Sequence, residues 1–174
     1  MIQNIFKLPV FSFFMASKVP RHIAIILDGN RRYAKKLGLQ PWKGHEFGVK
    51  KLNDLMKWCQ ELGIKELTLY SFSTENFKRA RREKDILFNI FKREFNNMNH
   101  RENIFKNKIR INIIGKLEMF PKEIRKAMID IMKKTSKHNK FIVNFAMAYG
   151  GRQEIVDAVK KIIGDVKNNR IKKN

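Results

Sequence analysis

The stretch Ile23-Ala24-Ile25-Ile26-Leu27-Asp28-Gly29-Asn30-Arg31-Arg32-Tyr33 decides the fold. Its five leading apolar residues predict a strand buried on both faces, which is typical of a parallel sheet. A carboxylate, a glycine, an amide and two guanidiniums follow, at the carboxyl end where open α/β sheets bind ligands. Asp28 can hold Mg²⁺ there and the arginines can hold phosphate oxygens. An Asp-Gly turn followed by solvated arginines is an equally good interpretation of these residues alone.

The composition indicates one globular domain with anionic partners. The 174 residues carry 38 Lys and Arg against 16 Asp and Glu, a formal net charge of +22. Such an excess attracts nucleic acid, acidic lipid or phosphorylated small molecules, and charge alone does not choose among them. The single cysteine, Cys59, excludes an intramolecular disulfide framework and indicates a reducing, cytoplasmic compartment.

The first 18 residues are predicted to be an apolar and basic arm. Its apolar part, 8–16, is too short to span a bilayer, and only Lys7 precedes it, which disfavours a signal peptide. Phe and Lys together favour contact with a membrane face or a partner. The alternative is an arm that covers part of the domain. Residues 19–174 contain no linker and no repeat, which predicts a single domain.

Apolar runs and helical stripes alternate along that domain. Strands are predicted at 23–27, 66–72, 109–114 and 141–148, and helices at 31–37, 45–62, 83–99, from 121 onward and over 155–163. The alternation of 109–114 predicts an edge strand, and the apolar run 141–148 predicts a central one. The fold class is therefore α/β, a layered and mostly parallel central sheet flanked by helices.

Polar loops follow three of these strands. The first carries Asp28, Asn30, Arg31 and Arg32, the second carries Ser73, Glu75, Asn76, Lys78, Arg79, Arg81 and Arg82, and the third carries Arg152. A parallel sheet would bring all three to one rim, where one carboxylate among fixed cations suits a diphosphate with Mg²⁺ better than a duplex. Neither a glycine-rich phosphate loop nor a zinc-ligand spacing occurs. Each loop taken singly also fits helix capping or a solvated charge run, and His45 fits either a phosphate ligand or a packing residue.

Three segments together closely resemble the cis-prenyltransferases, the undecaprenyl and dehydrodolichyl diphosphate synthases. They are 22–33 with Gly44-His45, 70–79, and 144–158, and the resemblance runs from 19 to 163. The sequence Gly44-His45-Glu46-Phe47-Gly48 is most similar to archaeal members. The resemblance implies a polyprenyl diphosphate synthase of glycosyl-carrier lipid biosynthesis. An allylic diphosphate, farnesyl or geranylgeranyl, ionises, isopentenyl diphosphate attacks, and proton loss leaves a cis double bond.

The same resemblance implies roles for particular residues. Asp28 binds Mg²⁺ and steers the diphosphate, which Gly29, Asn30, Arg31 and Arg32 cradle with Tyr33 and His45 beside it. Ser73, Thr74 and Glu75 contact substrate, and Phe77 and Arg79 flank the site. Asn76 has the family's proton-acceptor position, although an amide is a poor base and positioning is the easier task. Leu55, Met56, Phe88, Phe91 and Phe95 are candidates for an apolar sleeve around the growing chain, or for plain core.

The chain departs from the family pattern at its end. Family members carry a later Arg-x-Ser-Gly-Glu-x-Arg segment that binds isopentenyl diphosphate, supplies a second acidic metal ligand and builds much of a dimer face. We therefore expect the allylic half of the site here, in a fragment that is inactive alone or in a chain that needs a partner. A homodimer or heteromer and peripheral membrane contact are expected from the family. A basic nucleic-acid-binding domain is the least favoured alternative.

Overall fold

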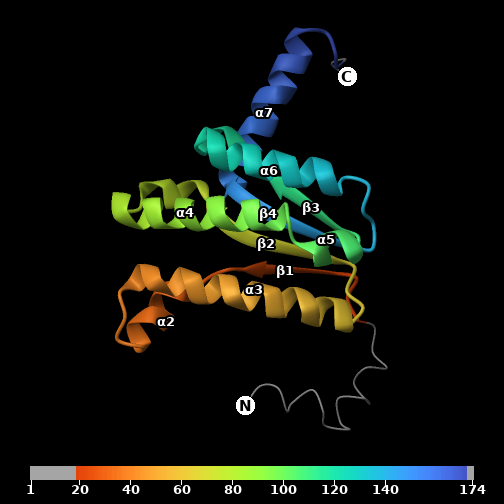
Figure 1. Cartoon of the computed structure of the whole chain (residues 1–174). Coiled ribbons are helices and arrows are strands. Elements are labelled where there is room, and N and C mark those ends of the chain that lie inside the picture. The colour runs from red at the N-terminus through yellow and green to blue at the C-terminus, as the bar shows by residue number, and fades with distance from the viewer. Residues whose placement is uncertain (1–18, 172–174) are drawn as a thin grey trace.

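The fold is a parallel sheet with helices, shown in Figure 1 as a computed structural model that describes residues 19–171. The strands are β1 (His22–Ile26), β2 (Glu66–Ser73), β3 (Ile109–Ile114) and β4 (Phe141–Tyr149). Their order is β1-β2-β4-β3, and every neighbouring pair is parallel. The predicted α/β fold is confirmed, with β3 at an edge and β4 inside. The predicted arm, residues 1–18, lies outside the described residues.

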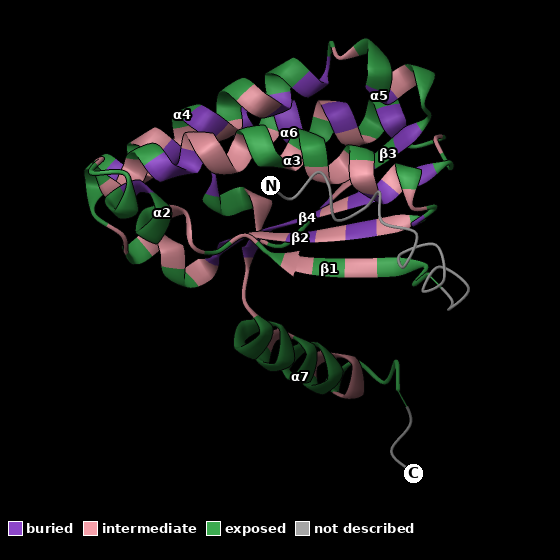
Figure 2. Cartoon of the chain, turned by 90° about the horizontal axis from the view of Figure 1, so that it is seen from below, coloured by how far each residue is buried: buried purple, intermediate pink, exposed green. Residues whose placement is uncertain are grey.

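Most helices cover one face of this sheet. They are α2 (Asn30–Lys36), α3 (Gly44–Glu61), α4 (Arg81–Met98), α5 (Glu102–Lys106), α6 (Lys122–Thr135) and α7 (Gly151–Lys167), with 3-10 turns at η2 (Pro41–Lys43), η3 (Thr74–Lys78) and η4 (Leu117–Met119). Figure 2 shows α3 to α6 on one side of the sheet and α7 on the other. Over residues 19–171, no helix has both the length and the apolar character needed to cross a membrane.

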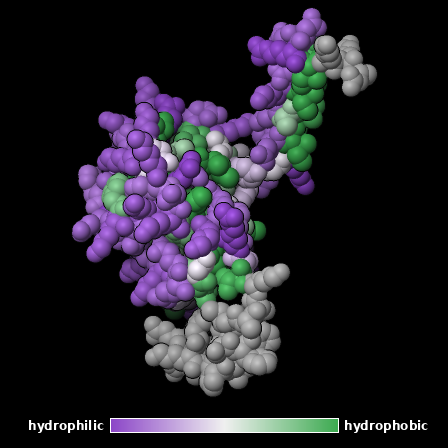
Figure 3. All heavy atoms as spheres, turned by 90° about the vertical axis from the view of Figure 1, so that its right-hand side faces the viewer, coloured by the Kyte–Doolittle hydropathy of each residue, from purple (hydrophilic) through white to green (hydrophobic). Residues whose placement is uncertain are grey.

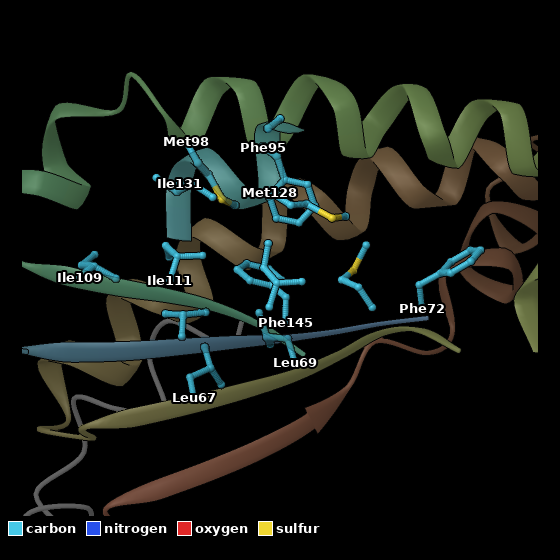
Figure 4. Close-up of a cluster of buried hydrophobic side chains, with 14 of the residues drawn as sticks. Leu67, Leu69, Phe72, Phe95, Met98, Ile109, Ile111, Met128, Ile131 and Phe145 are labelled. Carbon is cyan, nitrogen blue, oxygen red and sulfur yellow. The ribbon is translucent and has the colours of Figure 1, made fainter. Parts of the chain in front are cut away.

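The core lies between the sheet and α4 and α6 (Figure 4). Strand residues Leu67, Leu69 and Phe145 meet Phe95 from α4 and Met128 from α6, and all five are buried. Fully burying one such side chain contributes about 1.5–3 kcal/mol. This packing holds both helices against the sheet, so it also fixes where each helix begins.

Strand β1 corrects one expectation. The run 23–27 predicts a strand buried on both faces, and this is wrong. Ile23 and Ile25 pack against the core, but the side chain of Ile26 is 73% exposed. Among the described strands, β1 pairs with β2 alone and is therefore an edge. Five apolar residues in a row do not reveal how many neighbours a strand has.

The opposite face of the sheet carries polar side chains that bond across the strands. His22 Nε2 lies 2.8 Å from Thr68 Oγ1, Asn144 Nδ2 donates to Thr68 Oγ1 at 3.1 Å, and Asn112 Nδ2 donates to Asn144 Oδ1 at 2.9 Å. These bonds satisfy polar groups on a face that the described helices leave half-exposed.

Helix α7 forms as its apolar spacing predicts, but the apolar residues are not buried. Ile155 is 67% exposed and Ile162 is 54% exposed. Figure 3 shows an apolar stripe along this projecting helix. The helical stripe therefore predicted the helix correctly, and the described residues leave the stripe uncovered.

Helix α2 lies against the first turns of α3 because two glycines allow a close approach. A Cβ at Gly44 would lie 1.9 Å from the carbonyl oxygen of Asn30, and one at Gly48 would lie 2.7 Å from Asn30 Oδ1. No side chain fits in the first space without movement of the α2 backbone. The two glycines therefore set the position of Asn30 and of the residues that follow it.

The substitution Gly44→Ala should destabilise the protein by about 1–3 kcal/mol, because the added methyl group forces α2 away from α3. Urea unfolding followed by circular dichroism measures the effect. Gly164→Ala on α7 is the matched control, since a Cβ there meets nothing within 4 Å, and helix propensity predicts about 0.5–1 kcal/mol of stabilisation. Equal stabilisation by both substitutions would contradict the close approach.

Candidate active site

One cavity opens at the rim where β1 and β2 end. Its volume is about 1320 Å³. Ten of the thirteen site residues predicted from the sequence line it, namely Asp28, Gly29, Asn30, Arg31, Arg32, Tyr33, His45, Ser73, Asn76 and Arg79. The parallel sheet thus brings the first two polar loops together around a common space, as expected.

The turn after β1 presents a carboxylate at this rim. Gly29 has φ +87°, a left-handed conformation that favours glycine. Asp28 Oδ2 accepts a hydrogen bond from Arg32 Nη2 at 3.1 Å, and the Asp28 side chain is 77% exposed. The carboxylate is therefore held near a guanidinium while much of it still faces solvent.

Glu83 connects the cationic groups below this turn. Its Oε1 accepts from Arg79 Nη1 at 3.0 Å, lies 3.2 Å from His45 Nε2, and is 4.0 Å from Arg31 Nε. Both Glu83 and His45 are only 8% exposed. Because a carboxylate only accepts, Nε2 of His45 carries the proton of that bond. One buried anion thus holds groups from α2, from α3 and from the loop after β2.

Burial sets the protonation of His45. Desolvation lowers the pKa of His45 below its ordinary value, and this outweighs the hydrogen bond to Glu83, which works in the other direction. The positive charges of Arg79 and Arg31 also lower it. His45 is therefore a neutral hydrogen-bonding group near neutral pH.

The turn after β2 is closed by Ser73 and Asn76. The backbone N–H of Ser73 donates to Asn76 Oδ1 at 3.1 Å, and the Ser73 hydroxyl accepts from the backbone N–H of Asn76. Oδ1 of Asn76 is thus occupied within the turn. The Nδ2 group is the part of this amide that is left to donate toward the cavity.

Three other predicted residues, Thr74, Glu75 and Phe77, are not among those lining the cavity. Phe77 packs edge-on against Phe72 with ring centroids 5.0 Å apart. A Cβ at Gly150 would lie 2.6 Å from Thr74 Oγ1, so Thr74 faces the end of β4. Arg152 is also exposed outside the lining, because α7 leads away from the sheet.

The inner walls of the cavity are mainly apolar. Leu55, Met56, Phe91 and Phe95 of the predicted sleeve line it, whereas Phe88 packs with Phe72 and Phe120 instead. Additional lining comes from Leu87, Ile90 and Met98, which sequence reasoning had not singled out for the cavity. The cavity therefore joins a cationic mouth to an apolar interior.

The sequence patterns do not single out Glu83, although it joins three of the predicted site residues. The available signal was weak, because Arg79 belongs to the loop before α4 and helical spacing does not relate it to Glu83. That signal was hidden because the surrounding run, 78–84, is rich in cations. Within the described part of the chain, no three His, Cys, Asp or Glu side chains gather as a metal-binding group.

The pH dependence of the protein's stability should reveal the protonation of His45. The pKa of His45 is lower in the folded protein than in the unfolded chain, so the unfolded chain binds a proton on this imidazole more readily. The contribution of neutral His45 to the free energy of unfolding is therefore complete above about pH 6.5 and is lost as the pH falls through the folded pKa. The urea midpoint should fall less between pH 8 and 5 in His45→Gln than in the wild type. His100→Gln, at an exposed position, is the control. If the urea midpoint of His45→Gln fell between pH 8 and 5 by as much as that of the wild type, His45 would not be the buried neutral group.

Comparisons with known proteins agree with this geometry. A family model described as "Putative undecaprenyl diphosphate synthase" matches residues 26–174. A Thermococcus kodakarensis protein, tritrans,polycis-undecaprenyl-diphosphate synthase (geranylgeranyl-diphosphate specific), is 46% identical over 157 residues, which are 90% of this chain and 60% of that protein. An isoprenyl transferase of Thermus thermophilus is 48% identical over 145 residues, which are 83% of this chain and 55% of that protein. The chain thus spans about 60% of the length of such relatives.

Solved structures lead to the same family. Lavandulyl diphosphate synthase from Lavandula x intermedia, in complex with dimethylallyl diphosphate, matches with a TM-score of 0.82 and 30% identity over 88% of this chain and 65% of that chain. A probable undecaprenyl diphosphate synthase from Campylobacter jejuni matches with a TM-score of 0.68 and 30% identity over 90% of this chain and 66% of that chain. The resemblance found in the sequence is confirmed, and the chain belongs to the undecaprenyl diphosphate synthase family of prenyltransferases.

Proposed function

We propose that this chain binds an allylic diphosphate with Mg²⁺ and serves the addition of isopentenyl diphosphate to it in the cis configuration. The observation that carries the proposal is a cavity that joins Asp28, Arg32 and Arg79 at the mouth to Met56 and Phe91 inside. A prenyl diphosphate has the same two parts, an anionic head and an apolar tail. Farnesyl and geranylgeranyl diphosphates are the proposed starters.

The mouth suits the leaving group of such a reaction. As the carbon–oxygen bond of the allylic diphosphate breaks, negative charge accumulates on the diphosphate. Guanidiniums fixed where this charge develops lower the barrier, because they need little reorganisation. Glu83 fixes Arg79 by a 3.0 Å bond, and Asp28 fixes Arg32 by a 3.1 Å bond. Neutral His45, whose Nε2–H bonds Glu83, helps to hold that carboxylate in place beside Arg79.

The residues present fit Mg²⁺ when the substrate completes its coordination. Mg²⁺ in phosphate-handling sites is held by one or two carboxylates together with substrate oxygens, rather than by an all-protein cage. Asp28 supplies such a carboxylate, and its 77% exposed side chain can reach a metal–diphosphate complex. When bound, Mg²⁺ neutralises part of the diphosphate charge.

The apolar interior of the cavity suits the prenyl tail of the substrate. Each methylene that moves from water into apolar surroundings contributes about 0.8 kcal/mol. Leu87, Ile90 and Phe91 of α4 provide such surroundings on one side of the cavity. The second substrate, isopentenyl diphosphate, is proposed to bind near Ser73 and Arg79 with help from polypeptide that relatives contain beyond the matched region.

The remaining family positions receive indirect roles in this proposal. Thr74, Glu75 and Phe77 lie outside the cavity lining, so we assign them to holding the turn after β2 in place. Asn76 is assigned to positioning the diphosphate through Nδ2. The proposed setting is the cytoplasmic side of a membrane, where a polyprenyl product would leave, and the assembly is a homodimer or heteromer.

Asp28→Ala should abolish the Mg²⁺ dependence of farnesyl diphosphate binding. In an active assembly it should also lower turnover by roughly 10²–10³-fold, as expected for the loss of a preorganised electrostatic group. Titration calorimetry with Mg²⁺ or EDTA measures the binding, and incorporation of labelled isopentenyl diphosphate measures turnover. Asp85→Ala, at an exposed carboxylate paired with Arg81, is the control. If the wild type binds duplex DNA tightly at high salt and no prenyl diphosphate, the nucleic-acid alternative replaces this proposal.

Asn76→Asp separates positioning from proton acceptance. The carboxylate preserves an acceptor for the Ser73 N–H but replaces the donor group with negative charge. A positioning role predicts weaker farnesyl diphosphate binding and lower turnover, because the new charge repels the diphosphate. A proton-accepting role predicts retained or higher turnover, since a carboxylate is the better base. Asn97→Asp, at an exposed position on α4, controls for the added charge.

A further inference from the structure

An arginine stacked on a tryptophan joins the segment before α3 to the beginning of α4. The guanidinium carbon of Arg82, in the first turn of α4, lies 4.6 Å from the centre of the Trp42 ring. Trp42 belongs to η2, the short turn between α2 and α3. A guanidinium within about 6 Å of a tryptophan ring is attracted by the negative face of that ring. We call this pair the Trp42–Arg82 stack.

The arginines around Arg82 make a different kind of contact. Arg81 Nε lies 3.9 Å from Asp85 Oδ2 on the same helix, and Arg79 donates to Glu83. Over residues 19–171, Arg82 has no ion pair with a carboxylate. Its contact is therefore with a ring on another element, which is the kind of contact that ties two elements together.

Two adjacent residues of α4 thus hold two nearby residues of the segment opposite. Glu83 Oε1 lies 3.2 Å from His45 Nε2, and Arg82 is stacked on Trp42. A single contact lets two elements pivot about it, whereas a second contact beside the first fixes the angle between them. Gly44 lies between Trp42 and His45 in the chain, and its close approach to α2 fastens that helix to the same segment. The position of α2 therefore depends on α4.

The polar groups at the mouth belong to the elements that the stack ties together. One set, Asp28 and Arg32, comes from the turn and helix after β1, and the other, Asn76 and Arg79, comes from the segment before α4. Figure 1 shows α2 and the first turns of α3 and α4 at one end of the sheet. A diphosphate has two phosphoryl groups at a fixed separation, so it binds best when the two sets keep a matching distance.

We propose that the Trp42–Arg82 stack is a positioning contact that sets the spacing of these two sets and so favours a diphosphate over a monophosphate. The inference rests on the proposed function. A monophosphate can bind to one set alone, so its affinity depends less on the spacing. Neither Trp42 nor Arg82 lines the cavity, so the stack acts through α2 and α4 and not by contact with the substrate.

The test compares farnesyl diphosphate with farnesyl monophosphate on the full chain with Mg²⁺. Titration calorimetry gives the ratio of the two dissociation constants. In Trp42→Leu the preference for the diphosphate should fall by roughly three- to tenfold, the range expected for loss of a contact of this kind. Arg82 keeps its charge in this variant, so the fall would not come from a lost cation. Trp42→Phe, which keeps an aromatic face, should retain most of the preference.

Arg82→Met tests the stack from its other side, and Arg81→Met is the matched control. Both variants remove one exposed arginine from the first turn of α4, so the net charge changes equally. Arg81→Met measures how the lost charge alone affects the ratio, because a diphosphate carries more charge than a monophosphate. The preference for the diphosphate should fall several-fold further in Arg82→Met.

Two outcomes overturn the inference in distinguishable ways. If Trp42→Leu binds both compounds with the wild-type ratio, the stack only braces η2 and the inference is wrong. Where circular dichroism shows that Trp42→Leu does not fold, equal ratios in Arg82→Met and Arg81→Met lead to the same conclusion. Failure of the wild type to bind farnesyl diphosphate would overturn the proposed function, and this inference with it.

Discussion

Parallel pairing of β1 with β2 is the constraint on which the site depends. Ile26 lies opposite Tyr70 in this pair, so both strands leave the sheet at the same rim. Antiparallel pairing would have put Asp28 and Ser73 at opposite edges. The same topology requires α3 and α4 to begin near that rim, which brings His45 and Glu83 together. One feature of the sheet therefore produces both the polar mouth and the apolar walls behind it.

Glu83 makes the gathering of cations at this rim stable before any anion binds. Arg31, His45 and Arg79 would repel one another if the histidine were protonated and no carboxylate were near. The buried Glu83 offsets the arginine charges, while desolvation keeps His45 neutral. The cationic groups thus stay in place for a diphosphate. Removing one partner of such a buried set would leave uncompensated charge, which is strongly unfavourable.

Much of this arrangement could be predicted from the sequence, because periodicity and chain order are local properties. The apolar run 141–148 and the alternation of 109–114 correctly predicted a central and an edge strand. The burial of β1 on both faces was predicted wrongly, because its exposure depends on which neighbours pair with it. The role of Glu83 was missed for a related reason, since His45 reaches it only after two helices have folded onto one sheet. Similarly, Gly44 is required by a contact with Asn30 that no local pattern reveals.

The order of residues along α4 corresponds to distance from the mouth. Glu83 in its first turn holds Arg79 at the mouth, Leu87 and Ile90 follow as apolar wall, and Glu94 then accepts a hydrogen bond from Arg101. In the proposed reaction, bond cleavage depends on charge at the first of these positions, and apolar surface at the next positions surrounds the tail. Because two helical turns separate Glu83 from Ile90, a substitution at Ile90 can change the apolar wall while Arg79 and His45 keep their geometry. The fold therefore separates the charged mouth from the apolar wall along one helix.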